Sequence, residues 1–288
     1  MTITIADHAG YCYGVERAFK LVTEAADRGE EDLYTLGPII HNPQAVDRLK
    51  EEKGVVPVTD LEEIPGGMVV IRSHGVPPEI IARAKAKGLQ VVDCTCPFVK
   101  TVQRKANGLV EEGYRLFIVG ERSHPEVVGI LGHAGGDAMV IEDAEEVPDL
   151  TKASDRIGVV VQTTQEIKRL QQIISALLPK CRELRVYNTI CQATEQRQYA
   201  ARELAGRVDL MLVVGGRNSG NTRRLLSVCQ DATAHCFHIE TASEIEPGWL
   251  EEVEHVGLTA GASTPDFVIQ EVLARLDVLS GAAGTECL

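Results

Sequence analysis

The chain has few of the features that mark nucleic-acid-binding or membrane proteins. Aromatic residues make up only 4% of its 288 residues, which argues against a surface on which bases stack. The formal net charge is −13, so a phosphate backbone would be repelled on average. No apolar run approaches the length of about 18 residues that a membrane-spanning helix needs, and the first residues lack the pattern of a signal peptide. We therefore expect a cytoplasmic protein with neither nucleic acid nor membrane as partner.

The sequence contains no CxxC pair, although it has eight cysteines. Zinc-ribbon and thioredoxin-like sites therefore have no support, and a disulfide framework is not expected in a cytoplasmic chain. Most of the cysteines are predicted to be small buried hydrophobic residues. The eight are Cys12, Cys94, Cys96, Cys181, Cys191, Cys229, Cys236 and Cys287.

Apolar runs alternate with helical patterns along the chain, which predicts an α/β fold with buried parallel strands. The clearest predicted strands cover residues 68–71, 116–119, 158–161 and 210–214. The clearest predicted helices cover residues 97–112, 165–178 and 266–280. Residues 281–288 are predicted to form a flexible tail.

A cysteine follows a predicted strand at three places, Cys12, Cys96 and Cys191. Each is followed by two polar turns at nearly constant spacing. The first turns, at His41, His124 and Ser219, come 29, 28 and 28 residues after the cysteine. The second, at His74, Thr163 and Ser263, come 62, 67 and 72 residues after it. This period indicates an internal repeat.

The repeat predicts three pseudo-symmetric α/β lobes arranged as a trefoil. The lobes would cover residues 12–95, 96–190 and 191–280. Residues 1–11 would supply the missing strand of the third lobe. Because ligands bind at the carboxyl ends of parallel strands, a closed arrangement would bring the three cysteines to one centre.

Three equivalent thiolates suit a [4Fe–4S] cluster in which one iron lacks a protein ligand. Structural zinc prefers four ligands, and catalytic zinc with three cysteines is unusual. Cys94 is a possible rival or fourth ligand, but only Cys96 keeps the phase of Cys12 and Cys191.

The polar turns carry mostly neutral donors next to predicted helix starts, which is typical of a phosphate-binding site. Glu126 is a carboxylate in one of these turns and a candidate proton source. Ser219, Thr222 and Ser263 could instead be ordinary helix caps.

The chain resembles the 4-hydroxy-3-methylbut-2-enyl diphosphate reductase (LytB) family at these motifs, in order and over nearly its whole length. The matching segments include residues 12–18, 40–42, 73–76, 95–97, 124–127, 162–164, 190–194, 218–221 and 259–263. The resemblance implies three lobes around a central iron–sulfur cluster. It also implies reductive dehydroxylation of an allylic diphosphate by two electrons and two protons. The products would be isopentenyl and dimethylallyl diphosphate.

Site residues follow from the same resemblance. Cys12, Cys96 and Cys191 would hold one [4Fe–4S] cluster with an open iron site. Glu126, Thr163 and His124 would be catalytic. The substrate would be bound by His41, His74, His124, Thr163, Ser219, Gly220, Asn221 and Ser263. The resemblance also implies that electrons come from ferredoxin or flavodoxin. The sequence has no GxGxxG fingerprint in a suitable βαβ context, so direct binding of a nicotinamide cofactor is unsupported.

The chain departs from the family pattern at two positions. Gly220 stands where many members have a serine, and Cys94 replaces a small residue. A quinolinate-synthase-like cluster enzyme, which would bind a dicarboxylate, and a non-catalytic iron–sulfur carrier or sensor remain alternatives. A zinc protein is a further alternative that metal analysis would test.

Overall fold

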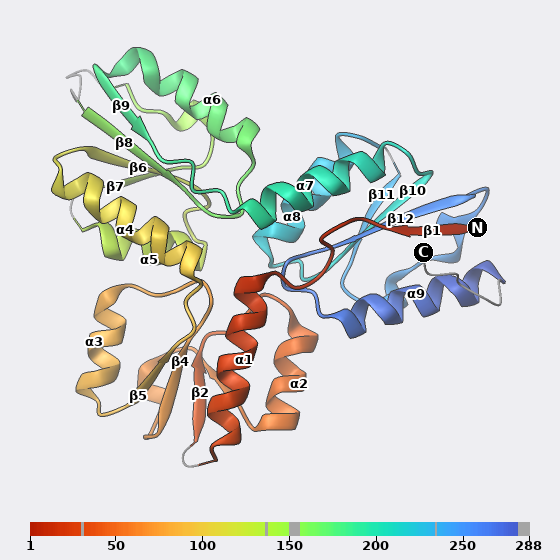
Figure 1. The fold of residues 1–288 in the computed structure, drawn as a ribbon, viewed down its shortest axis with the longest axis horizontal. Coiled ribbons are helices and arrows are strands. Elements are labelled where there is room, and N and C mark those ends of the chain that lie inside the picture. Colours follow the sequence, from red (N-terminus) through yellow and green to blue (C-terminus); the bar gives the residue numbers. More distant parts are fainter. Residues whose placement is uncertain (30–31, 136–137, 150–155, 234, 282–288) are drawn as a thin grey trace. The chain divides into compact units, whose positions relative to one another are not determined.

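The computed structural model describes residues 1–29, 32–135, 138–149, 156–233 and 235–281. These residues form three parallel sheets of four strands each, with helices packed on them (Figure 1). The predicted α/β class is therefore confirmed. Among the described residues, no helix is both long and apolar enough to cross a bilayer.

The three sheets share one strand order. Sheet B has the order β3 (Val56–Val58), β2 (Leu33–Leu36), β4 (Met68–Ile71), β5 (Gln90–Asp93). Sheet C has the order β7 (Ala138–Ile141), β6 (Arg115–Val119), β8 (Arg156–Val161), β9 (Glu183–Val186). Sheet A has the order β11 (Cys236–Ile239), β10 (Leu210–Val214), β12 (His255–Ala260), β1 (Thr2–Ile5). The predicted threefold repeat is thus present in the topology.

Sheet A is completed by the first strand of the chain. β1 pairs in parallel with β12, with Thr2 opposite His255 and Ile5 opposite Leu258. In sheets B and C the corresponding edge strands, β5 and β9, directly precede the next repeat. The polypeptide therefore supplies one strand of this sheet from a distant part of the sequence.

Nine of the described helices are α-helices, three for each sheet. The helices near sheet B are α1 (Tyr13–Asp27), α2 (Pro43–Lys53) and α3 (Pro78–Ala86). Those near sheet C are α4 (Pro97–Glu111), α5 (Pro125–Ala134) and α6 (Ile167–Leu177). Those near sheet A are α7 (Gln192–Ala205), α8 (Gly220–Gln230) and α9 (Asp266–Ser280).

The central strands form the core because helices cover both faces of each sheet. Every residue of β4 and of β10 is buried. In sheet C, one cluster around Leu116 and Ile118 lies on one face, and another around Phe117 and Val119 lies on the other. The apolar runs in the sequence therefore mark strands that are buried on two sides.

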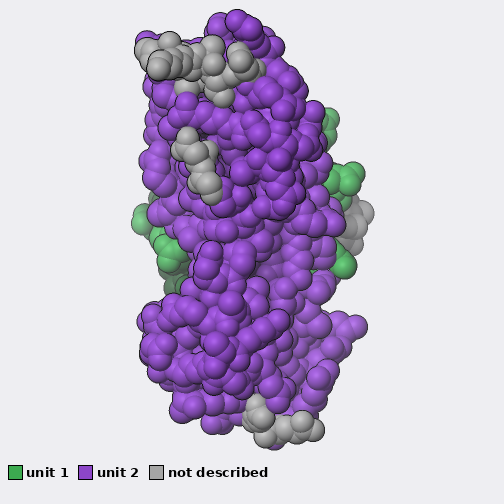
Figure 2. Space-filling view, turned by 90° about the vertical axis from the view of Figure 1, so that its left-hand side faces the viewer, with its two compact units in different colours: residues 1–13, 41–45, 192–288 green, residues 14–40, 46–191 purple. Residues whose placement is uncertain are grey.

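The chain divides into two compact units, coloured separately in Figure 2. Unit 1 consists of residues 1–13, 41–45 and 192–288 and contains sheet A. Unit 2 consists of residues 14–40 and 46–191 and contains sheets B and C.

The sequence does not predict the edge strands β3 and β11. β3 has only three residues, including Pro57, and β11 contains His238. Both lie at sheet edges, where the apolar pattern is weak. The predicted tail at 281–288 lies outside the described residues except for Gly281, which ends α9 in a left-handed conformation.

Candidate functional site

Two of the predicted cluster cysteines occupy equivalent backbone positions in unit 2. The Cys96 N–H donates to the Ser73 carbonyl at 2.9 Å, and the Cys191 N–H donates to the Thr163 carbonyl at 2.9 Å. Each cysteine therefore follows the last strand of its sheet and is tied to the polar turn of the neighbouring strand. Cys96 also begins α4, where Pro97 occupies the first helical position.

Cys12 has the same arrangement in unit 1. Its N–H donates to the Ala262 carbonyl at 3.2 Å, directly before Ser263. Gly10, two residues earlier, has a φ of 89°, which favours glycine. All three cysteines are partly accessible, and none forms a disulfide.

Cys94 differs from Cys96 in its surroundings. The Cys94 side chain is fully buried, and burial raises the pKa of its thiol to about 12. Cys94 is thus enclosed in the core, whereas Cys96 is partly accessible. The structure favours Cys96, in agreement with the repeat phase.

Glu126 is a buried carboxyl at the start of α5. Its side chain accepts hydrogen bonds from the Thr163 N–H at 2.7 Å and from the Thr163 hydroxyl at 2.8 Å. The residue is only 2% exposed. Burial raises the Glu126 pKa to about 7, although the two bonds from Thr163 act in the opposite direction. A carboxyl with this pKa holds a proton on a large fraction of molecules at neutral pH.

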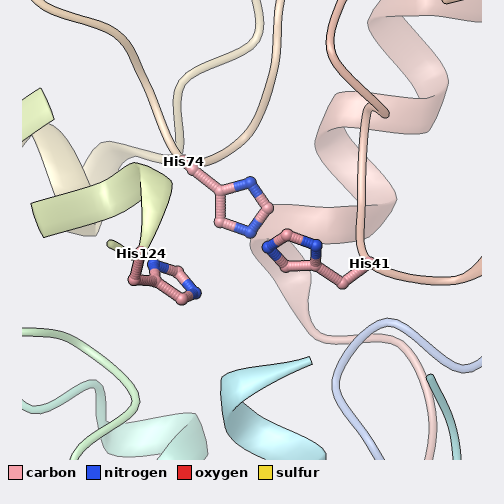
Figure 3. Close-up of side chains that lie close together, drawn as sticks. All are labelled: His41, His74 and His124. Carbon is pink, nitrogen blue, oxygen red and sulfur yellow. The ribbon is translucent and has the colours of Figure 1, made fainter. Parts of the chain in front are cut away.

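Two predicted histidines meet next to this carboxyl in unit 2. The His74 and His124 rings contact each other edge to face, with centroids 5.4 Å apart and an angle of 81° between their planes (Figure 3). His124 caps α5, and its Nδ1 accepts the Glu126 N–H at 3.1 Å. Because Nδ1 accepts a hydrogen bond, Nε2 of a neutral His124 carries the ring proton.

The predicted diphosphate residues of unit 1 surround the start of α8. Ser219 caps this helix, with its Oγ accepting the Thr222 N–H at 3.3 Å. Gly220 is the first helical residue. Ser263 Oγ donates to the carbonyl of His41 at 3.2 Å. His41, which Figure 3 also labels, belongs to unit 1.

Asn221 is the strongest sign of a ligand in unit 1. It is 4% exposed, and neither Oδ1 nor Nδ2 has a hydrogen-bond partner among the described residues. The Oγ1 of Thr222 is likewise buried without a partner there. Buried polar groups are normally satisfied, so these atoms indicate a polar ligand at the helix start.

Several residues that support the site are not evident from the sequence motifs. A Cβ at Gly216 would lie 2.3 Å from the His41 carbonyl oxygen. The buried Arg197 donates to the Gly10 carbonyl at 2.8 Å and so holds the loop before Cys12. Arg197 lies on an amphipathic helix far from Cys12 in sequence, and no local pattern distinguishes it from a surface arginine.

These features define a class of α/β protein in which polar turns and cysteines outside any disulfide lie at the carboxyl ends of repeated parallel sheets. The chain belongs to the LytB family, whose model matches residues 3–277.

Two similar proteins share a functional name. A 4-hydroxy-3-methylbut-2-enyl diphosphate reductase of Geobacter sp. (strain M21) is 49% identical, covering 97% of this chain and 98% of the relative. The enzyme of that name from Aquifex aeolicus (strain VF5) is 46% identical and covers 95% of each chain.

Two solved structures are also similar. One is titled as (E)-4-hydroxy-3-methyl-but-2-enyl diphosphate reductase, the terminal enzyme of the non-mevalonate pathway. It has a TM-score of 0.72 and 44% identity, covering 96% of this chain and 100% of the other. The second, a reductase from Plasmodium falciparum, has a TM-score of 0.89 and 27% identity, covering 96% and 88%.

Proposed function

We propose that the chain reduces 4-hydroxy-3-methylbut-2-enyl diphosphate to isopentenyl and dimethylallyl diphosphate. The main support is the match to the family over residues 3–277, together with the name that its relatives share. The overall change takes two electrons and two protons. The carbon–oxygen bond of the hydroxyl group breaks, and the oxygen leaves as water.

Cys12, Cys96 and Cys191 are the proposed ligands of one [4Fe–4S] cluster. Their fit rests on the donor set: three cysteines in matching backbone positions, each partly accessible and outside any disulfide. Such a cluster, when bound, supplies electrons and an open iron with Lewis-acid character.

The diphosphate is the proposed ligand of the polar residues at the helix starts. Asn221, with its unsatisfied buried amide, supports this role most directly. The α8 start adds backbone N–H groups, including that of Gly220, which have no partner within the helix. The other proposed contacts are His41, His74, His124, Thr163, Ser219 and Ser263.

Glu126 is the proposed proton donor. The two hydrogen bonds from Thr163 hold its carboxyl in one orientation. A pKa of about 7 makes the protonated form available at neutral pH. Thr163 orients the carboxyl, and His124 fixes the backbone that carries it.

Ferredoxin or flavodoxin is the proposed electron donor, and we propose a cytoplasmic location.

The first test is iron and acid-labile sulfide analysis of anaerobically purified protein, followed by an assay with methyl viologen as reductant. We expect about four of each per chain, and consumption of the diphosphate substrate. About one zinc without sulfide would contradict the proposal. If the protein is purified without metal, the cluster is reconstituted before the assay.

A further inference from the structure

The exposed face of α4 has a local charge opposite to that of the chain as a whole. The chain carries 42 acidic and 29 basic residues. From Cys94 to Val110, however, it contains Lys100, Arg104 and Lys105 and no carboxylate. Because Val99, Val102 and Leu109 bury the opposite side of the helix, these cations lie on the outer face. We name Lys100, Arg104 and Lys105 the α4 basic patch.

Two hollows flank the patch within unit 2, and Arg104 lines both of them. One has a volume of about 470 Å³ and lies between α4, Ile81 of α3 and His133 of α5. The other has a volume of about 330 Å³ and is bordered by Lys105 and Tyr187. Arg104 therefore stands on a ridge with a depression on each side. The two hollows beside Arg104 could receive side chains that project from a partner surface.

The carboxylates that line these hollows are already paired. Asp93 Oδ2 lies 2.6 Å from Lys100 Nζ, and Glu112 forms an ion pair with Arg185. Arg104 instead donates to Thr101 Oγ1 at 3.1 Å, and Lys105 Nζ lies 3.8 Å from the centre of the Tyr187 ring. Among the described residues, neither Arg104 nor Lys105 has a carboxylate partner. Their two positive charges remain available to an anionic surface.

The patch is continuous with the end of α4 that carries Cys96. Cys96 caps the helix, and Arg104 follows eight residues later, about 12 Å along the helix axis. Phe98 stands seven residues before Lys105, on the same side of the helix, and is 47% exposed, an unusual position for a large aromatic side chain. Charged residues around an exposed apolar contact are typical of a transient protein interface.

We propose that the α4 basic patch and Phe98 form the docking surface for a small acidic one-electron carrier protein. This inference rests on the proposed function, because the electrons would enter the cluster that Cys96 is proposed to hold. Two reduced carriers each lose one electron per turnover. As the carbon–oxygen bond breaks, one proton leaves with the hydroxyl group as water. The two electrons and the second proton form a new carbon–hydrogen bond in the product. Carboxylates around the redox group of the carrier would face Arg104 and Lys105.

The test uses the holoenzyme and flavodoxin as the acidic carrier. Arg104→Glu is compared with Arg104→Lys and with a matched control, Lys50→Glu. Lys50 is an exposed residue of α2, outside the patch. Lys100 is left unchanged because its ion pair with Asp93 supports the loop before Cys96: Asp93 Oδ1 accepts the Thr95 N–H at 2.9 Å.

Binding is measured by titration calorimetry at several salt concentrations, and turnover is measured with reduced flavodoxin and with methyl viologen. For Arg104→Glu we expect about tenfold weaker flavodoxin binding with a smaller salt dependence. The KM for flavodoxin should rise by a similar factor, while turnover with methyl viologen stays unchanged. Arg104→Lys and Lys50→Glu should behave like the wild type in every measurement.

Three outcomes would overturn the docking surface. One is equal binding of flavodoxin by Arg104→Glu and the wild type. Another is an equal loss of turnover with both reductants, which would give Arg104 a structural role. The third is an equal effect of Lys50→Glu, which would indicate net charge alone. If the wild type binds flavodoxin through Arg104 but reduces no substrate with methyl viologen, the proposed function fails while the surface stands.

Discussion

Glu126 is the residue whose chemistry depends most on its surroundings. Replacing Glu126 by Gln keeps its size and a hydrogen bond from the Thr163 N–H but removes the acidic proton. We expect the iron content and substrate binding to be retained. Turnover should fall by a factor of about 100 or more. The measurements are iron analysis, a substrate titration and the methyl viologen assay. Full turnover in this variant would exclude Glu126 as the proton donor.

The same substitution predicts a change in the pH dependence of stability. The Glu126 pKa is about 7 in the folded protein, against 4.5 for a free side chain. The folded state therefore binds more protons between these values, and raising the pH through this range destabilises it by up to about 3 kcal/mol. Urea unfolding should show a loss of stability from pH 4.5 to 7 that is larger in the wild type than in Glu126→Gln. Parallel curves for the two proteins would contradict the buried, protonated carboxyl.

Cys94 and Cys96, which are separated by one residue, form a matched pair for substitution. Cys96→Ala should lose most of its iron because it removes a proposed ligand. Cys94→Ala removes a thiol that is buried and out of phase with the repeat, so it should keep about four iron atoms at a cost of about 1 kcal/mol in stability. Iron and sulfide analysis with thermal unfolding separates the two. The opposite result would show that the repeat phase selects the wrong thiol.

The sequence predicts the candidate site residues best where a residue recurs at a fixed phase or belongs to a motif. The three cysteines and the polar turns meet both conditions. The proposed roles still need the tests above. Arg197 and Gly216 are different, because their importance comes from contacts with Gly10 and His41, which are distant in sequence. Such contacts exist only once the chain has folded.

At the scale of elements, α5 depends on a close approach to the turn that precedes α3. A Cβ at Gly132 would lie 2.5 Å from the Cβ of Pro77. Gly132→Ala should therefore destabilise the protein by about 1–3 kcal/mol and lower turnover, since α5 carries His124 and Glu126. Thermal unfolding and the methyl viologen assay check this.

Gly108 in α4 provides the control for that substitution. A Cβ there meets nothing within 4 Å, so Gly108→Ala should stabilise the protein by about 0.5–1 kcal/mol through the higher helix propensity of alanine. Equal effects of the two substitutions would contradict the tight packing of α5.

Helices and strands with a strongly periodic sequence are predicted correctly, whereas elements with a weak apolar pattern are missed. The predicted helix over 266–280 matches α9 (Asp266–Ser280), and the predicted strands at 68–71 and 210–214 match β4 and β10. The helix predicted over 165–178 begins later, at Ile167, after the turn that contains Thr163. The edge strands β3 and β11 escape prediction because their short sequences need not be apolar on both faces, whereas the edge strands β1, β5 and β9 are predicted from the repeat.

At the scale of the molecule, unit 1 joins the two ends of the described chain in one sheet. The N–H groups of Thr2 and Ala6 point toward β12 and donate to the carbonyls of Glu254 and Leu258. The alternation of a strand places the Thr4 N–H on this side and the Ile5 N–H on the outer edge. The threefold repeat predicts this completion, because a strand precedes each of the three cysteines and residues 1–11 supply the one before Cys12.

Proline substitutions in β1 test the pairing. Thr4→Pro removes a ladder donor and the contact between Thr4 Oγ1 and His255 Nε2 at 2.9 Å, so it should lower the unfolding temperature by several degrees. Ile5→Pro, at a residue 42% exposed, removes an N–H that faces away from β12 and should have a smaller effect. Equal shifts in calorimetry would contradict the register.

The pairing of β1 with β12 also sets an order of events during synthesis. About 250 residues separate the two strands in the sequence, so on a ribosome β1 emerges roughly 10–50 s before its partner. A strand that stays unpaired during this time can pair with the wrong strand or with another chain. Two of its four residues are threonines, and the strand is only four residues long, which limits this risk. The β1 strand can therefore stay unpaired in the nascent chain until β12 is synthesised and pairs with it.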